Sequence, residues 1–290
     1  MSLQILINGL ALGSVYALIS TGFSVIFNVL KFSNFSHGAL MTFCAFTSYF
    51  LSAQHKFGLL ATVAVAIVTG ALVALAGEFV AFRRITLRDS SPVYFFVSSI
   101  TLGTMFEGLV VIKVGANYYN YPRFFNPSTI KLGGVILSVS DVIMFVCSSA
   151  ALIILAYMVQ KTRMGRALRS VSFDRDTASL MGINVTRVIQ FAFIISGSLA
   201  GLAGVFLGIN YTLYPTMGGM VVKGFIASVI GGLGSLPGAV IGAMLLGLVE
   251  TLLVHAVGSG YSVVFLFLIM LAFLLIRPQG ISGSNIQEKA

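Results

Sequence analysis

The sequence carries very little charge. Asp, Glu, Lys and Arg make up 9% of its 290 residues, whereas apolar residues make up 58%, and the mean hydropathy is +1.02. Soluble domains contain about 25% charged and about 45–50% apolar residues. So few charges cannot cover a water-facing surface. A soluble globular fold is therefore excluded, and most of the surface must face lipid.

The sequence also lacks the motifs of nucleotide-binding proteins and of common hydrolases. It contains no G-x-x-x-x-G-K-[ST] phosphate loop, no H-E-x-x-H zinc motif and no G-x-S-x-G nucleophile elbow. Its histidines, His37, His55 and His255, are far apart and have no partner at metal-ligand spacing. We therefore expect no enzymatic activity in this chain and no cofactor.

Cysteine is scarce and tryptophan is absent. Cys44 and Cys147 both lie in apolar segments without CxxC or Cys/His spacing. We interpret them as small buried apolar residues rather than as metal ligands or a disulfide.

The net charge of +9 arises from basic residues that lie between apolar runs. This distribution is typical of membrane proteins and argues against nucleic acid as a partner. The first four residues include no Lys or Arg, and the apolar run from Ile5 to Leu30 exceeds the roughly 7–15 residues of a signal-peptide core. We expect this run to be a retained first span.

Several apolar runs are candidate transmembrane helices, because a helix crosses the hydrocarbon core in about 20 residues. They are Ile5–Leu30, Gly38–Ser52, Leu59–Phe82, Val93–Val114, Val139–Gln160, Val188–Leu213, Met220–Leu236, Gly238–Val257 and Tyr261–Ile276. The second and seventh are short, and the seventh contains Lys223, so either could be broken or re-entrant. We predict an all-α, polytopic transmembrane bundle of eight or nine spans, forming one domain over residues 1–290. Long runs without alternation exclude a β-barrel.

Basic residues predict the orientation of the bundle. Arg83, Arg84 and Arg88 follow the third run, and Arg277 follows the last. The segment after the fifth run carries Lys161, Arg163, Arg166, Arg169, Arg175 and Arg187. Placing these groups in the cytoplasm puts the N-terminus outside and the C-terminus inside. Termini on opposite sides of the membrane require an odd number of spans, which favours nine crossings. The segment 115–138 becomes external, with Arg123 and Lys131 as its basic residues.

The predicted cytoplasmic loop 161–187 has the pattern of a short helix. Asp174 and Asp176 can cap and charge a helix N-terminus, and Gly182 is placed to end the helix. The helix would offer a small apolar surface made of Ala178, Leu180 and Met181. Such a surface suits a groove on a peripheral protein. From the residues alone, a solvated loop that only sets topology is an equal alternative.

Four motifs occur in order along the chain. The first is Asn8-Gly9 with Gly13-Ser14-Val15-Tyr16-Ala17-Leu18, and the second is Asn34-Phe35-Ser36-His37-Gly38. The third is Gly165-Arg166-Ala167-Leu168-Arg169 followed by Ala178, Leu180, Met181, Gly182 and Ile183. The fourth is Gly231-Gly232-Leu233-Gly234-Ser235-Leu236-Pro237-Gly238-Ala239, with Arg277-Pro278-Gln279-Gly280 at the end. In this combination the chain resembles the membrane permeases of branched-chain amino-acid ABC importers, the LivH/LivM family.

The resemblance implies a permease subunit that forms half of a translocation pathway in the bacterial plasma (inner) membrane. The implied partners are a second permease subunit in a hetero-pair, two ABC ATPase subunits that hydrolyse ATP, and an extracellular or periplasmic solute-binding protein. Residues 176–182 are similar to the E-A-A-x-x-x-G loop of ABC permeases, which seats in the ATPase, although the downstream I-x-L-P part is missing. The implied coupling residues are Gly165, Arg166, Arg169, Asp174, Asp176, Ala178, Leu180, Met181 and Gly182.

Polar residues within the apolar runs are candidates for the substrate pathway, because ionisable groups in a membrane are costly. Glu250, five positions before His255, can line the pathway or form an internal tie. The polar residues between the first two runs form either a broken helix that shapes the pathway or a simple turn, with the turn favoured. The predicted pathway residues are Asn34, Ser36, His37, Gly231, Gly232, Gly234, Ser235 and Glu250.

Two other functions stay open. The cargo could be urea, a short amide or another amino acid, which a permease sequence does not distinguish. The chain could also be a stand-alone secondary carrier or channel. A proton-coupled carrier needs a relay of ionisable groups, and isolated carboxylates fit that requirement poorly.

Overall fold

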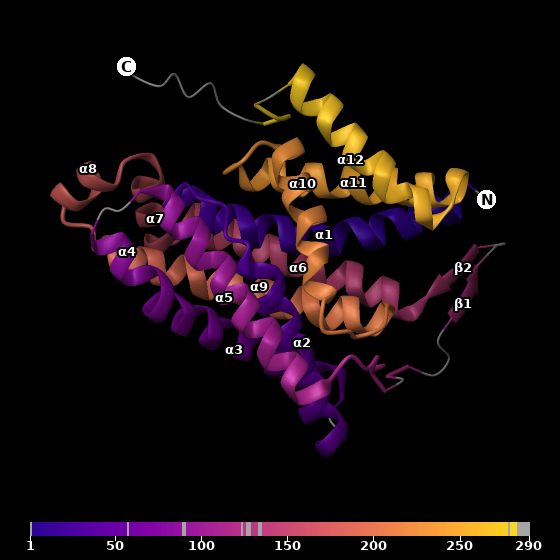
Figure 1. The fold of residues 1–290 in the computed structure, drawn as a ribbon. Helices are drawn as coiled ribbons and strands as arrows, with labels where there is room; N and C mark the ends of the chain where they lie inside the picture. Colours follow the sequence, from indigo (N-terminus) through magenta and orange to yellow (C-terminus); the bar gives the residue numbers. More distant parts are fainter. Residues whose placement is uncertain are drawn as a thin grey trace.

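The computed structural model describes residues 2–56, 58–88, 91–122, 124–125, 129–132, 135–277 and 279–282. Arg123 and Pro278, named above, lie outside these ranges. Within them the chain is predominantly helical, as predicted (Figure 1).

Every predicted apolar run contains a helix. These helices are α1 (Ser2–Leu30), α2 (Ser36–His55), α3 (Leu59–Gly77) with the π-helical turn η1 (Glu78–Phe82), α5 (Pro92–Val114), α6 (Val139–Lys161), α9 (Val185–Asn210), the 3-10 turn η2 (Met217–Met220) with α10 (Val221–Gly231), α11 (Leu236–Val257) and α12 (Ser259–Ile276). The connections contain α4 (Arg83–Leu87), α7 (Arg163–Phe173) and α8 (Arg175–Leu180).

A β-hairpin departs from the all-α prediction. Strand β1 (Thr129–Leu132) pairs antiparallel with β2 (Val135–Ser138), with Thr129 opposite Ser138 and Leu132 opposite Val135. Both strands contain the β-branched residues that favour extended backbone. The hairpin lies beside the N-terminal end of α1, at the opposite end of the bundle from α7 and α8 (Figure 1).

In the described part of the chain, seven helices are long and apolar enough to cross a membrane. The other two predicted spans are the segments that the sequence marked as short. Helix α2 has 20 residues but carries several polar side chains among its apolar ones, and α10 has only 11 residues. The fold is therefore a multi-span helical bundle.

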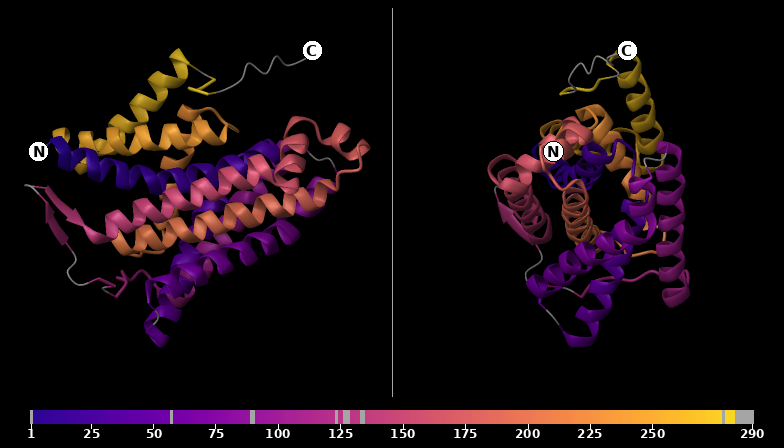
Figure 2. Two further views of the ribbon diagram at one scale, coloured as in Figure 1. Left: turned by 180° about the vertical axis from the view of Figure 1, so that it is seen from behind. Right: turned by 90° about the vertical axis from the view of Figure 1, so that its left-hand side faces the viewer.

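Helices α1 and α9 form the centre of this bundle, and most of their residues are buried. Helix α11 packs along α1, and α3 packs along α9. Figure 2 shows the long helices running side by side, and in its right-hand panel several are seen nearly end-on. Apolar side chains are exposed along α3, α5, α6 and α12. These helices form the surface that lipid or a partner would cover.

The α3–α9 contact depends on small residues. A Cβ atom added to Gly197 would lie 2.1 Å from the carbonyl oxygen of Gly70, and one added to Gly201 would lie 2.1 Å from that of Ala66. Lipid tails are as apolar as the helices, so helices in a membrane gain stability from such close backbone packing.

Helix α2 begins inside the bundle rather than at its end. Residues 31–35 turn back from the end of α1, and Phe32 and Asn34 are buried. As a result Ser36 lies beside Gly103, halfway along α5, and His37 contacts Ser196, halfway along α9. Irregular backbone at this depth is tolerated only where protein surrounds it.

Helix α10 begins at the same depth. Its preceding turn η2 touches the start of α2, since a Cβ atom added to Gly38 would lie 2.2 Å from the carbonyl oxygen of Gly218. From this contact, α10 runs to its C-terminal end, where Gly232 has φ +104° and Gly234 has φ +85°. The N-terminal ends of two short helices thus meet inside the bundle.

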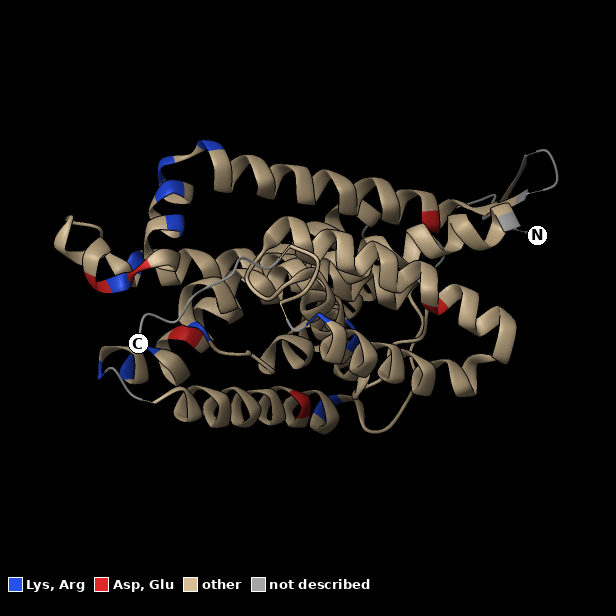
Figure 3. Ribbon diagram, turned by 90° about the horizontal axis from the view of Figure 1, so that it is seen from above, with Lys and Arg blue, Asp and Glu red and all other residues tan. Residues whose placement is uncertain are grey.

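Charged residues gather at the ends of the helices. Figure 3 shows most Lys and Arg at one end of the bundle. That end holds the arginines of α4, α7 and α8. Lys223 is a basic residue that instead lies within the apolar body of the protein.

Candidate functional site

A largely buried ion pair and a tyrosine hydroxyl join three helices that are far apart in the sequence. Lys223 Nζ on α10 donates to Glu250 Oε1 on α11 at 2.5 Å and to the hydroxyl of Tyr16 on α1 at 3.1 Å. The Tyr16 hydroxyl donates to Glu250 Oε2 at 2.8 Å. The Lys223 and Glu250 side chains are 21% and 9% exposed. The cluster is electrically neutral, which makes burial of the two charges tolerable.

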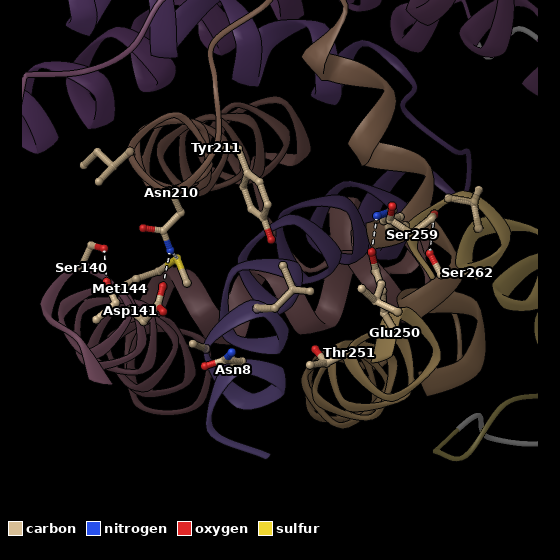
Figure 4. Close-up of a pocket in the computed structure, with 17 residues that line it drawn as sticks. Asn8, Ser140, Asp141, Met144, Asn210, Tyr211, Glu250, Thr251, Ser259 and Ser262 are labelled. Atoms are coloured by element: carbon tan, nitrogen blue, oxygen red, sulfur yellow. Dashed lines mark hydrogen bonds and ion pairs between the residues drawn. The ribbon is translucent and has the colours of Figure 1, made fainter. Parts of the chain in front are cut away.

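This ion pair lies on the wall of a cavity of about 610 Å³. On the opposite wall, Asn210 Nδ2 donates to Asp141 Oδ1 at 2.6 Å, and the hydroxyl of Tyr211 points into the space between (Figure 4). The remaining lining residues include polar groups and the apolar Leu12, Met144, Ile209, Val254 and Val263. The cavity therefore combines charged groups of both signs with apolar surface, as small-molecule sites do.

The cavity opens toward the hairpin end of the bundle. It is lined by Ser138 at the end of β2, Ser140 at the start of α6 and Asn210 at the end of α9. Helices α7 and α8 lie at the other end (Figure 1).

Glu250 was the predicted pathway residue that lines this cavity. The sequence suggested His255 as a companion, but His255 lies in the last turn of α11 and is exposed. The internal tie is made by Lys223 and Tyr16 instead. Lys223 carried a signal, since it interrupts an apolar run, whereas nothing in the sequence connects Tyr16, Asp141 or Asn210 to Glu250.

Asn34, Ser36 and His37 lie elsewhere, at the buried start of α2. Asn34 Oδ1 accepts bonds from the backbone N–H and the hydroxyl of Ser36, at 3.2 and 2.7 Å. His37 Nδ1 lies 3.1 Å from Ser196 Oγ. Asn34, Ser36 and Ser196 border a hollow of only about 10 Å³. The arrangement is a turn between α1 and α2 inside the protein, and a role of these residues in the substrate pathway stays a prediction.

Gly231, Gly232, Gly234 and Ser235 lie at a third place, the C-terminal end of α10. There the N–H groups of Ile281 and Ser282 donate to the carbonyls of Ile230 and Gly231, both at 2.9 Å. Ser235 Oγ accepts the N–H of Gly238 at 3.2 Å and caps α11. These contacts satisfy helix ends.

The loop 161–187 contains two helices with side-chain caps. Thr162 Oγ1 accepts the N–H of Gly165 at 3.0 Å at the start of α7. Asp174 Oδ1 accepts the N–H groups of Asp176 and Thr177, at 2.9 and 3.0 Å, and Oδ2 accepts the Thr177 hydroxyl at 2.9 Å. The bonds from the Thr177 N–H and hydroxyl lower the pKa of Asp174. The predicted cap is confirmed, and Gly182, at φ +82°, lies where a helix was expected to end.

The exposed surface of this loop differs from the prediction at one residue. Leu180 and Met181 are exposed, 88% and 79%, but Ala178 is only 4% exposed and packs inward. Its small side chain lies beneath the helix because the α8 face that carries it is turned toward the bundle. Phe173, which is 94% exposed, adds the apolar residue that the sequence analysis missed. Arg166 and Arg169 are exposed beside it, and the Arg169 guanidinium donates to the carbonyl of Val159.

The loop is tied to the cavity helices through α1. The Ser172 hydroxyl donates to the carbonyl of Asn28 at 3.0 Å, and Arg175 Nε donates to that of Val29 at 2.9 Å. Both acceptors lie at the end of α1, the helix that carries Tyr16. The loop therefore contacts the helix that carries one member of the buried cluster.

Comparisons with known proteins agree with this architecture. Residues 5–274 match the family model described as the permease component of branched-chain amino acid transport systems. The chain is 32% identical to the high-affinity branched-chain amino acid transport system permease protein LivH of Escherichia coli K12, covering 99% of this chain and 97% of the relative. It is 31% identical to BraD, the corresponding permease protein of Pseudomonas aeruginosa, with the same coverage.

The fold also resembles a solved structure. The alignment with PsaBC from Streptococcus pneumoniae in complex with Fab has a TM-score of 0.51 at 15% identity and covers 93% of this chain and 89% of that one. At this identity the likeness concerns the fold alone. The seven apolar helices and the permease relatives fit the multi-pass bacterial inner-membrane protein predicted from the sequence. The chain belongs to the family of permease components of branched-chain amino acid transport systems.

Proposed function

We propose that this chain is the transmembrane permease subunit of an ATP-driven ABC importer for branched-chain amino acids and forms half of its translocation pathway. The observation that carries the proposal is the match to permease components over nearly the whole chain. The chain lacks a phosphate loop, so partner subunits would hydrolyse the ATP.

The proposed partners are a second, related permease, two ABC ATPase subunits and a solute-binding protein outside the membrane. The ATPase would dock on the exposed loop surface of Phe173, Leu180 and Met181, with Arg166 and Arg169 nearby. Their apolar side chains need a partner's groove to leave water. Dimer closure of the ATPases would push α7 and α8, and the bonds to Asn28 and Val29 would pass the movement to α1.

The proposed topology has nine crossings, with the N-terminus outside and the C-terminus in the cytoplasm. The positive-inside rule supports this choice, because α4, α7 and α8 lie together at the arginine-rich end (Figure 3). The two short helices count as crossings when the irregular segments before them are included. Residues 31–35 with α2 then form one crossing, and residues 211–220 with α10 form another. The cavity opens to the outside in this topology.

Docking is tested by copurification of the ATPase subunits with tagged variants of this chain. Deletion of residues 174–182 should abolish association and leave membrane insertion intact. Leu180→Asp should weaken association strongly, because it puts a charge on the apolar contact. The matched control is Ser179→Asp, at a neighbouring exposed position of α8 that is already polar. Copurification of the ATPase with the deletion variant would refute the docking role.

Function is tested in proteoliposomes. Leucine should accumulate against its gradient only when both permeases, the ATPases and the binding protein are present and ATP is supplied. Uphill accumulation by this chain alone would establish a secondary carrier instead. Uptake of urea or short amides without any branched-chain amino acid by the full complex would establish a different cargo.

A further inference from the structure

The fold does not need the Lys223–Glu250 ion pair for its stability. Replacing a buried ion pair with apolar residues of similar size is often neutral or stabilising, so stability alone does not explain two charges within apolar helices. The pair also faces the cavity of about 610 Å³ on the proposed outer side. Intramembrane ionisable groups beside such a space are candidates for contact with the cargo.

We propose that Lys223 and Glu250, positioned by the buried Tyr16, form a binding site for the zwitterionic head of an amino acid on its way through the membrane. This inference rests on the proposed importer function. The ammonium of Lys223 would donate to the α-carboxylate, and Glu250 would accept from the α-ammonium. The buried hydroxyl of Tyr16 would keep its bond to Glu250 and hold that carboxylate in place. In the present structure Lys223 and Glu250 bond to each other and to Tyr16. The amino acid would replace the direct bond between Lys223 and Glu250.

Charge balance gives the site its selectivity. An amino acid places one negative and one positive group between Lys223 and Glu250, so each buried charge keeps an opposite partner. An amine or a carboxylic acid alone would satisfy one of the two residues and leave the other charge unpaired, which is strongly unfavourable in a buried site. Urea and short amides carry no charge and cannot replace either member. The site therefore favours amino acids over the amide cargo that the sequence left open.

The rest of the cavity suits an apolar side chain. Its volume of about 610 Å³ lies within the range of small-molecule sites, about 300–1,000 Å³. Leu12, Ile209, Val254 and Val263 supply apolar walls. On the opposite wall Asp141 accepts a bond from the neutral amide of Asn210. Its carboxylate would repel the side chains of aspartate and glutamate, so the same cavity selects against acidic amino acids.

A cysteine reporter in the cavity tests the site directly. Thr251 lines the cavity, and Thr251→Cys changes little volume. Cys147 is removed as Cys147→Ser. Cys44 is buried, so a soluble reagent should not reach it. In the assembled complex without binding protein or nucleotide, leucine at ten times its Kd should slow alkylation of the reporter about tenfold by mass action.

Three compounds separate a zwitterion site from a merely apolar one. Leucine should protect the reporter, whereas leucinamide, which lacks the carboxylate, and 4-methylpentanoate, which lacks the ammonium, should not at the same concentration. The double variant Lys223→Met/Glu250→Gln keeps the pair neutral and should abolish protection by leucine. If that variant fails to assemble, the comparison of the three compounds on the otherwise unchanged complex still decides.

Equal protection by the three compounds would overturn the inference, as would unchanged protection in the double variant. Absence of protection in a complex that transports leucine would overturn it while leaving the importer function standing. A complete, ATP-hydrolysing complex that moves no amino acid would instead show that the proposed function itself is wrong.

Discussion

The contact between the starts of α2 and α10 has no room for a side chain at Gly38. A Cβ atom there would lie 2.2 Å from the Gly218 carbonyl oxygen and 2.7 Å from Val221 Cβ, whereas ordinary contact begins at 3.4 Å. Gly38→Ala must therefore separate the two segments by about 1.2 Å, the difference between those oxygen distances. The obstructing atoms are backbone or Cβ atoms, so no change of rotamer relieves the clash.

Two opposing contributions decide whether Gly38→Ala raises or lowers the free energy of unfolding. Overpacking costs about 1–3 kcal/mol, while alanine in place of glycine within a helix gains up to about 1 kcal/mol. Because the clash is between rigid atoms, we take the upper end and expect Gly38→Ala to lower the free energy of unfolding by about 2 kcal/mol. Unfolding of the purified protein in mixed micelles with increasing dodecyl sulfate measures this loss.

The matched control lies in the same turn. Gly219, next to Gly218, has no atom within 4 Å of an added Cβ, so Gly219→Ala should leave the free energy of unfolding nearly unchanged. The clash would displace the start of α10, which carries Lys223. Gly38→Ala should therefore also slow leucine transport in the complex. Wild-type stability of Gly38→Ala, or an equal loss in Gly219→Ala, would refute the reasoning.

Three further predictions concern the coupling loop and the chain end. Asp174→Ala should weaken ATPase copurification, whereas Asp174→Asn should keep it because the amide oxygen still accepts the capping N–H groups. The lowered pKa keeps the Asp174 carboxylate charged, and its stabilisation of α8 would be lost only as pH falls through that pKa. Docking should therefore not change between about pH 6 and pH 8. A decrease in copurified ATPase within that window would contradict the cap. Arg175→Ala removes the bonds to Val29, so ATP hydrolysis by the complex should persist while leucine uptake falls. Unchanged uptake would exclude the Arg175–Val29 contact as the connection. Gly280→Ala, at φ +75° with its Cβ 2.4 Å from a backbone nitrogen, should cost about 1–3 kcal/mol in the same micelle titration, and Gly260→Ala, which meets open space, should not.

Much of the architecture could be predicted because it depends on local properties. Each apolar run became a helix, since a backbone in lipid must satisfy its own hydrogen bonds. The cap at Asp174 was also predictable, because its partners lie two and three residues away. The orientation of α8 was not, because Ala178 turns inward only once that helix packs on the bundle.

The candidate pathway residues were predicted one by one and then separated by the fold. Asn34 lies at the buried start of α2, Ser235 caps α11 and lines a second cavity of about 690 Å³, and Glu250 faces the cavity beside Lys223. The partners of Glu250 are 27 and 234 positions away in the chain. No spacing rule connects residues so far apart.

The sequence by itself determined three things: that this is a membrane protein, which segments form helices, and which loop carries the arginines. These follow from hydropathy and charge, which are properties of each residue. The tertiary structure alone decided which polar side chains meet. A buried charge must find an opposite charge wherever the packed helices bring one within reach. For Glu250 that place is beside Lys223 and Tyr16, at the wall of the cavity.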